Sequence, residues 1–419
     1  MVSRTLNVSS LGRHFESLPD PRNTRNRRHL LVDVIVIAMC GIIVGCDGPT
    51  AIARWARHKA EWLAKFLELP HGIPAKDCFR RVLSALKPAA FQKCFESLIA
   101  DCLAVQEARQ EAEQAAQQPE VQAEAEQATE QSTGKRFIAI DGKTMRRSHN
   151  RAAELGALHV VSAWATEYGL ALGQVATEEK SNEITAIPEL LDQLDISDST
   201  ITIDAMGCQR EIAQKIVTGG GDYVLAVKDN QPKLHEAIRE FFLDHLEDDM
   251  ARVPHGYHGT SDEGHGRADE RTYYTAKVPE EFPLRALWPG LKAFGCATRM
   301  MTRPDGTHSD DVRYYILSRD LSGPRFATAV RGHWGIENSL HWVLDMNFRE
   351  DENRTRERTL ANNISWLRRF AISKLKQHPL KDSLRGKMQA AGWSDDFLAE
   401  VLMLHFRRTA PRGVKLILQ

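Results

Sequence analysis

Two short stretches decide the fold: Arg136-Phe-Ile-Ala-Ile-Asp141 and Thr200-Ile-Thr-Ile-Asp204. Each is an apolar, β-branched run that ends in a carboxylate, which is typical of a buried strand. Open α/β sheets build their sites at the carboxyl ends of strands, so neighbouring strands of this kind would bring Asp141 and Asp204 together. A single strand-end Asp is more often a cap or turn residue, and it is the matching pair that indicates a site.

The elements around these stretches alternate in a way that predicts a mixed α/β sheet with helices on its faces. We expect a hairpin over residues 158–177, helices over 184–194, 211–217 and 232–246, and a strand over 223–227. This order is also that of a ribonuclease H-like fold. Residues 247–318 interrupt it with a polar loop from His255 to Arg267, followed by strands near 271–278, 291–301 and 312–318, and they form the predicted β-rich insertion.

The flanking regions have a different character. Residues 1–105 predict a helical N-terminal domain, for which a helix-turn-helix and a plain helical bundle both fit. Residues 106–134 are rich in Glu, Gln and Ala and predict a linker or a solvated helix. The catalytic domain is expected over 135–375, with its insertion at about 247–318, and a basic tail over 376–419.

Charge is distributed unevenly along the chain. The formal net charge is −1, yet residues 106–131 carry seven Glu and one Arg. From Arg349 to the end there are fifteen Lys or Arg and eight Asp or Glu, a local excess of +7 (15 − 8). A local positive face of this kind is what a DNA-binding surface requires.

The cysteines and the apolar runs exclude other classes of protein. The seven cysteines are scattered without a C-x-x-C pair, which indicates reduced thiols in a cytoplasmic protein and makes a zinc ribbon improbable. The run from Leu30 to Cys46 contains Asp33 and is shorter than the ~20 residues that a membrane span needs, so we expect a buried helix and no membrane partner. The N-terminus lacks the apolar core of a signal peptide.

A third acid is predicted on a helix. In the segment 331–345, His333, Glu337, His341 and Asp345 follow one another at four-residue intervals and share roughly one face. A polar helix face is the plain interpretation. A zinc site is a sharper rival, but the segment lacks H-E-x-x-H. Clustered carboxylates also suit Mg²⁺, and two such ions can clamp the attacking and leaving oxygens of a phosphodiester.

Several motifs together resemble one family. They are Ile140-Asp-Gly-Lys-Thr144, Thr202-Ile-Asp-Ala-Met-Gly-Cys208, Val227-Lys-Asp-Asn-Gln231 and His333-Trp-Gly-Ile-Glu-Asn338. Residues 134–375 resemble the catalytic domain of bacterial DDE-type insertion-sequence transposases, in the branch associated with H-repeat and Rhs elements. The N-terminal module, with His71-Gly-Ile-Pro74 and Phe79, resembles the domain that accompanies it.

The resemblance implies an activity, a cofactor and partners. It identifies Asp141, Asp204 and Glu337 as the catalytic and metal-binding triad, with Mg²⁺ as the cofactor and Mn²⁺ as an alternative. It implies cleavage of DNA at the element ends and strand transfer into target DNA, without a covalent protein–DNA intermediate. It also implies a homodimer on DNA in the bacterial cytoplasm, at the nucleoid when bound.

The chain departs from the related transposases around the glutamate. Those proteins carry a Tyr, Arg, Glu, Lys signature, whereas this chain has Val330, His333 and Leu344 at the Tyr, Arg and Lys positions. Arg331 is a candidate to replace the arginine, and the lysine has no evident replacement. The resemblance therefore does not extend to a DNA hairpin intermediate.

The candidates for DNA contact lie around the three acids. They are Lys143, Arg146, Arg147, Lys228, Asn230, Gln231, Arg331, His333, Trp334, Arg354 and Arg356, and Arg358, Arg368 and Arg369 also flank the glutamate helix. Cationic side chains of this kind position the DNA backbone without reading sequence. Three alternatives stay open: a ribonuclease H-like nuclease without strand transfer, a decayed transposase that only binds DNA, and a small-molecule metallohydrolase.

Overall fold

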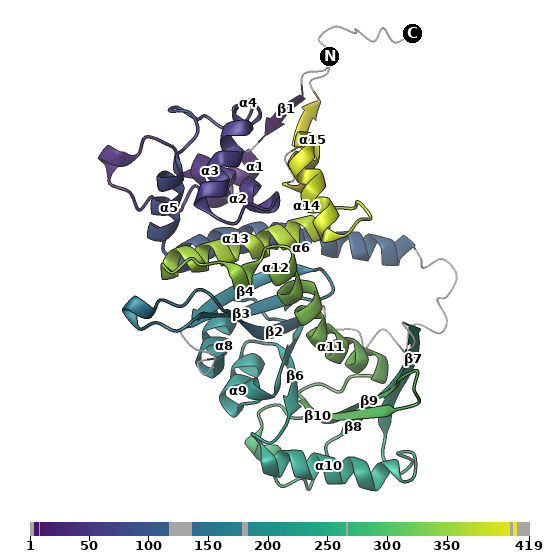
Figure 1. Ribbon diagram of the computed structural model, residues 1–419. Helices are drawn as coiled ribbons and strands as arrows, with labels where there is room; N and C mark the ends of the chain where they lie inside the picture. The colour runs from purple at the N-terminus through teal and green to yellow at the C-terminus, as the bar shows by residue number, and fades with distance from the viewer. Residues whose placement is uncertain are drawn as a thin grey trace, which may run out of the picture. The chain divides into compact units, whose positions relative to one another are not determined.

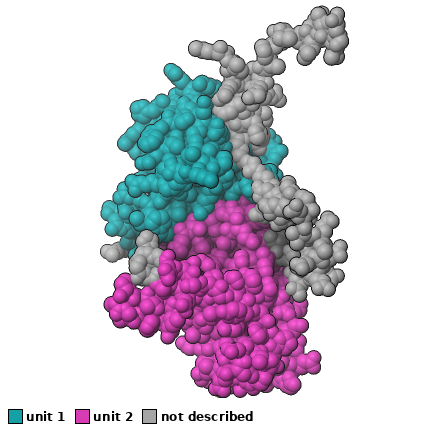
Figure 2. Space-filling view, turned by 90° about the vertical axis from the view of Figure 1, so that its right-hand side faces the viewer, with its two compact units in different colours: residues 1–107, 145–158, 342–419 teal, residues 108–144, 159–341 magenta. Residues whose placement is uncertain are grey.

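The computed structural model describes residues 4–7, 9–116, 136–177, 183–264, 267–402 and 405–408. The chain forms two compact units, which Figure 2 shows in separate colours. Unit 1 comprises residues 1–107, 145–158 and 342–419, and unit 2 comprises residues 108–144 and 159–341. Unit 1 is thus built from both ends of the chain and the segment 145–158, and unit 2 from the rest of its middle.

Unit 2 contains a nine-stranded sheet with the order β4-β3-β2-β5-β6-β10-β9-β8-β7 (Figure 1). Its strands are β2 (Arg136–Met145), β3 (Leu158–Ala165), β4 (Leu170–Thr177), β5 (Ser199–Ile203), β6 (Asp222–Val227), β7 (His255–Gly264), β8 (Arg267–Lys277), β9 (Ala293–Thr302) and β10 (His308–Leu317). This arrangement confirms the predicted mixed α/β class with a large sheet.

The two Asp-ending stretches are adjacent parallel strands. β2 pairs with β5 from Arg136↔Ser199 to Ile140↔Ile203, and β5 pairs in parallel with β6. Asp141 and Asp204 therefore come directly after Ile140 and Ile203, the last pair of residues that joins the two strands. β2 itself continues to Met145, so Asp141 lies within the strand rather than at its end.

Among the described residues, the helices that accompany the sheet are α8 (Glu183–Asp192), α9 (Arg210–Thr218), α10 (Pro232–Leu246) and α11 (Gly323–Ile336). Successive side chains on β2 point to opposite faces. Asp141 lies against His341, in the turn that follows α11, while Gly142 lies against Glu183 at the start of α8. The start of α8 and the turn after α11 therefore lie on opposite faces of the sheet at β2.

The predicted insertion extends the same sheet. β10 pairs antiparallel with β6, and β9, β8 and β7 continue from it as an antiparallel meander. The prediction of a polar loop from His255 to Arg267 is wrong, because β7 occupies His255–Gly264. Its Gly-rich sequence carries little strand propensity, and pairing with β8 along its whole length supplies the backbone hydrogen bonds that the local sequence does not indicate.

Unit 1 is mainly helical. Its elements are α1 (Ser9–Gly12), α2 (Leu31–Ile43), α3 (Pro49–His58), α4 (Ala60–Leu63), α5 (Lys76–Ala85), α6 (Pro88–Ala116, which runs on into unit 2), α12 (Trp342–Met346), α13 (Arg358–Gln377), α14 (Leu384–Trp393), α15 (Asp395–Val401) and the strand pair β1 (Arg4–Asn7) with β11 (His405–Arg408). Residues 106–116 of the predicted linker continue α6, and its remainder lies outside the described residues, as do 409–419 of the predicted tail. Among the described residues, no helix has both the length and the apolarity that crossing a membrane would need.

The core of unit 1 contains an ionic cluster. Glu350 lies 3.5 Å from the guanidinium groups of both Arg368 and Arg369, and all three side chains have an exposed fraction of 0%. The prediction that Arg368 and Arg369 are DNA-contact candidates is therefore wrong, because both side chains are enclosed in the helical core. Periodicity alone could not distinguish this from a solvated arginine pair.

Candidate active site

Glu337 follows directly after α11, in a π-helical turn, η7 (Glu337–His341). A π turn widens the hydrogen-bonded ring by one residue and is frequently found at functional sites. Here it leaves the Glu337 side chain 67% exposed and buries His341, which is 6% exposed. The polar helix face predicted for residues 331–345, with a polar residue at every fourth position, is therefore not continued regularly past this turn.

Three side chains converge at the point where β2 meets this turn. Nδ1 of His341 lies 3.5 Å from Oδ2 of Asp141 and 3.5 Å from Oε2 of Glu337. One ligand atom from each of the three residues lies within 4.8 Å of the others. Nε2 of His341 is buried and has no hydrogen-bond partner in the part of the chain that the structure describes. Two carboxylates and an imidazole at this spacing form a donor set that fits a divalent cation.

Asp204 lines the same cavity but lies outside this three-residue cluster. The cavity has a volume of about 510 Å³, and its lining includes Asp141, Asp204 and Glu337. Oδ1 of Asp204 accepts hydrogen bonds from the backbone N–H groups of Met206 and Gly207, at 3.1 and 3.4 Å, and so caps the short helix η5 (Ala205–Gly207). The fold thus brings all three predicted acids to one cavity.

The protonation of the site depends mainly on burial. Burial raises the pKa of Asp141 to about 6; the charges of Glu337 and Asp204 add to this shift, while His341 and the Gly142 N–H oppose it. A hydrogen bond from His341 is the main cause that lowers the pKa of Glu337, and the positive charge of Lys143 contributes. Clustered acids that repel one another in this way are stabilised by a bound cation.

The residues after β6 hold the Asp204 turn in place. Nδ2 of Asn230 donates to the carbonyl of Ala205 at 2.6 Å, and Nε2 of Gln231 donates to the carbonyl of Cys208 at 3.0 Å. Both amides are thus engaged with the backbone next to Asp204. Lys228, just before them, lines the cavity itself.

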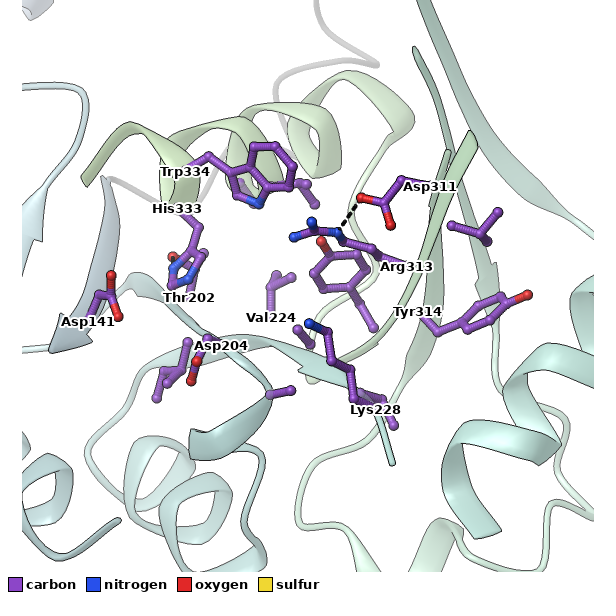
Figure 3. A pocket seen from close by; sticks show the side chains of 18 of the residues that line it. Asp141, Thr202, Asp204, Val224, Lys228, Asp311, Arg313, Tyr314, His333 and Trp334 are labelled. Atoms are coloured by element: carbon purple, nitrogen blue, oxygen red, sulfur yellow. Dashed lines mark hydrogen bonds and ion pairs between the residues drawn. The ribbon is translucent and has the colours of Figure 1, made fainter. Parts of the chain in front are cut away.

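His333 and Trp334, on α11, line the pocket shown in Figure 3. Nδ1 of His333 lies 3.1 Å from the Thr202 hydroxyl, and burial lowers the pKa of His333. Trp334 is 38% exposed, and the guanidinium of Arg313 lies 4.2 Å from its ring centroid. Arg331 is half exposed and lies 3.8 Å from Asp262.

The remaining candidates divide between the units. Lys143 is buried in unit 2, beside Glu337. Arg146, Arg147, Arg354 and Arg356 are exposed and belong to unit 1. Arg146 forms an ion pair with Asp351 at 3.0 Å.

His341 and Arg313 are two residues of this region for which the sequence predicts no catalytic or DNA-binding role. His341 stands four residues after Glu337, and its place on the same predicted helix face was the available signal. Arg313 lies in the middle of β10, and no local motif marks it; only the packing of α11 against the sheet brings it to Trp334.

Comparison with known proteins shows the family to which the chain belongs. The family model described as "Transposase DDE domain" matches residues 132–373, and the model described as "DDE_Tnp_1-associated" matches residues 12–99. The chain therefore belongs to the family of transposases with a DDE domain. The match to the first model covers every residue of the candidate site.

The relatives are bacterial. The chain is 37% identical to the "H repeat-associated putative transposase YhhI" of Escherichia coli K12, over 95% of this chain and 98% of that protein. It is 36% identical to the "Putative transposase YncI" of Escherichia coli O157:H7, over 95% of each chain. A solved structure of the piggyBac transposase synaptic complex with hairpin DNA covers 96% of this chain and 78% of its own, but with 10% identity and a TM-score of 0.36, which supports no inference.

Proposed function

We propose that this protein is a metal-dependent DNA transposase that cleaves DNA at the ends of an insertion sequence and joins them to target DNA. Asp141, Asp204 and Glu337 are its catalytic triad. The observation that carries the proposal is the convergence of these three acids, from two adjacent parallel strands and the end of one helix, on a single cavity. The strand order β4-β3-β2-β5-β6 supports a ribonuclease H-like core in which these residues occupy the active site.

The donor set supports a hard divalent cation, Mg²⁺ or Mn²⁺. Asp141, Glu337 and His341 would hold it, with Asp204 contributing from the same cavity lining. Such a cation, when bound, supplies Lewis acidity that activates water or a 3′-OH and neutralises charge on the scissile phosphate. Asp141 must be ionised to take part, and His341 favours the ionised forms of both neighbouring carboxylates.

The residues around the acids would position DNA. Lys143 and Lys228 place positive charge beside the cavity, where a phosphate backbone would bind. Arg331, His333 and Trp334 present a guanidinium, an imidazole and an aromatic face from α11. Asn230 and Gln231 contribute by holding the Asp204 turn. We propose that Arg146, Arg147, Arg354 and Arg356 bind DNA from unit 1.

Two protomers would act on two element ends, so we propose a homodimer on DNA. The mass of the complex on a DNA fragment that carries one element end, measured by light scattering, tests this part. One protomer per DNA end with no paired complex would contradict it.

Cleavage of a labelled DNA fragment that carries the flanking element end tests the activity. Wild-type protein with Mg²⁺ or Mn²⁺ should nick the fragment, and EDTA should abolish the reaction. Glu337→Gln and Asp204→Asn should lower the rate a thousandfold or more, which is about 4 kcal/mol in the barrier. Lys292→Gln, at a lysine outside the cavity lining, serves as the control.

The products distinguish the open alternatives. A joined product with target DNA supports strand transfer, whereas nicking alone would indicate a nuclease of the same fold. Binding without nicking in any metal would indicate a DNA-binding protein that has lost catalysis, and would overturn the proposal.

A further inference from the structure

A line of buried polar contacts lies on the face of β2 opposite the candidate active site. Nδ1 of His159, on β3, is 2.8 Å from the hydroxyl of Thr144, on β2. Nε2 of the same ring is 2.6 Å from Oε1 of Glu183, the first residue of α8. The side chains of His159 and Glu183 are 1% and 5% exposed. Three elements of unit 2 are thus joined by one line of polar contacts.

This line of polar contacts lies directly against Gly142, the residue that follows Asp141. Gly142 and Thr144 face it, while Asp141 and Lys143 point to the other side of the strand. A Cβ at Gly142 would overlap with Nε2 of His159 and Oε1 of Glu183. The backbone N–H of Gly142 in turn donates to Oδ1 of Asp141 at 2.8 Å. The Gly142 N–H that hydrogen-bonds to the Asp141 carboxylate therefore belongs to a residue packed against the His159–Glu183 pair.

A buried carboxylate–imidazole pair is an energetically unfavourable choice for a protein core. Burying a carboxylate and an imidazole costs free energy unless both are well paired, and an apolar pair of the same volume is often at least as stable. The Nε2–Oε1 contact has ion-pair distance, but it departs from the alignment of a good hydrogen bond. Packing alone therefore does not account for these residues, whereas a requirement for rigid geometry at Gly142 does.

We propose that Thr144, His159 and Glu183 are positioning residues that fix the Asp141 carboxylate for a divalent cation. The inference rests on the proposed function only in taking Asp141 as a cation ligand. Groups that orient a metal ligand typically change cation affinity about 10- to 100-fold when they are removed. The three residues act through the Gly142 peptide and do not touch the cation site themselves.

Binding of Mn²⁺ alone to the full-length protein, measured by the loss of the free-ion electron paramagnetic resonance signal, tests the proposal without requiring activity. Thr144→Val keeps the shape of the side chain and removes the hydroxyl that contacts His159. We expect it to weaken Mn²⁺ binding about 10-fold or more. Thr144→Ser restores the hydroxyl and should stay within about threefold of wild type.

Two further variants, Glu183→Gln and Gly142→Ala, test the contacts of His159 with Glu183 and of both residues with Gly142. Glu183→Gln preserves volume and removes the charge, and Gly142→Ala forces the pair away from the strand. Both should weaken Mn²⁺ binding by a similar factor while the circular dichroism spectrum stays native. Thr275→Val is the matched control: it removes a buried hydroxyl that donates to the Leu321 carbonyl at 2.8 Å, in the same unit but outside the cavity lining. It should lower the melting temperature and leave Mn²⁺ affinity unchanged.

The outcomes separate this inference from the proposed function. If Thr144→Val and Glu183→Gln lower the melting temperature but bind Mn²⁺ as wild type does, the three residues are only structural and the inference is overturned. It is equally overturned if Asp141→Asn binds Mn²⁺ normally. Wild-type protein that binds Mn²⁺ through Asp141 but does not cleave DNA would overturn the proposed function and leave the positioning role standing.

Discussion

Nδ1 of His341 lies 3.5 Å from Oδ2 of Asp141, and this contact joins a π-helical turn to the strand that carries the first acid. The same nitrogen lies 3.5 Å from Glu337. His341 therefore contacts both carboxylates of the three-residue cluster.

Replacing His341 should weaken cation binding. His341→Ala removes one donor atom and the main cause of the lowered pKa of Glu337, so we expect Mn²⁺ affinity to fall about 10- to 100-fold. Titration calorimetry with Mn²⁺ at pH 7.5 measures this. His245→Ala, at a histidine on α10 away from the cavity lining, should bind Mn²⁺ as wild type does. Equal affinities for both variants would exclude His341 from the site.

Cation affinity should depend on pH through Asp141. Burial raises the pKa of this carboxyl to about 6, and only its ionised form can bind a cation. Mn²⁺ affinity should therefore fall about tenfold per pH unit below pH 6 and level off above it. Calorimetric titrations at pH 5, 6, 7 and 8 provide the profile. A profile that remains flat down to pH 5 would contradict the raised pKa.

Asp141→Asn should stabilise the metal-free protein at neutral pH. A folded-state pKa raised from 3.8 to about 6 means that stability is lost as pH rises through this range, because the buried carboxyl ionises less readily than it does in the unfolded chain. The amide avoids this loss, so we expect a gain of roughly 2–3 kcal/mol at pH 7.5 that shrinks to near zero below about pH 4. Urea unfolding in EDTA at the two pH values measures it. A variant less stable than wild type at pH 7.5 would contradict the assignment.

The ionic core of unit 1 should be sensitive to loss of its carboxylate. Glu350→Gln leaves two fully buried guanidinium groups without their shared counter-charge, and we expect a loss of about 3–5 kcal/mol. Glu352→Gln is the matched control, because its partner Arg349 is exposed and surface ion pairs of this kind contribute little to stability. Thermal unfolding compares the two. Equal melting temperatures for Glu350→Gln and Glu352→Gln would show that the Glu350 charge does not stabilise the buried arginines.

The parts of the molecule that the sequence predicted depend on short-range pattern. The apolar runs before Asp141 and Asp204 predicted strands, and their parallel pairing through Ile140 and Ile203 follows the expectation of neighbouring strands. The apolar run in α2 predicted a buried helix for the same reason. These signals are local, because a buried strand or helix must be apolar whatever it packs against.

Other features depend on partners far away in the sequence. β7 has a polar, Gly-rich sequence and becomes a strand only by pairing with β8. Arg368 and Arg369 have the sequence of an exposed basic face and are buried because Glu350 lies between them. Asn230 and Gln231 matched a motif at the site, but their hydrogen bonds to the Asp204 turn became visible only in three dimensions.

By itself, the sequence determined the two apolar strand segments that lead to Asp141 and Asp204 and the helix that leads to Glu337, since apolar runs and helical spacing can be read from consecutive residues. Only the tertiary structure decided that His341 joins Asp141 and Glu337, and that the buried His159–Glu183 pair supports Gly142 from behind. The physical reason is that side-chain contacts between elements depend on how the elements pack, and one-dimensional periodicity carries no record of that packing.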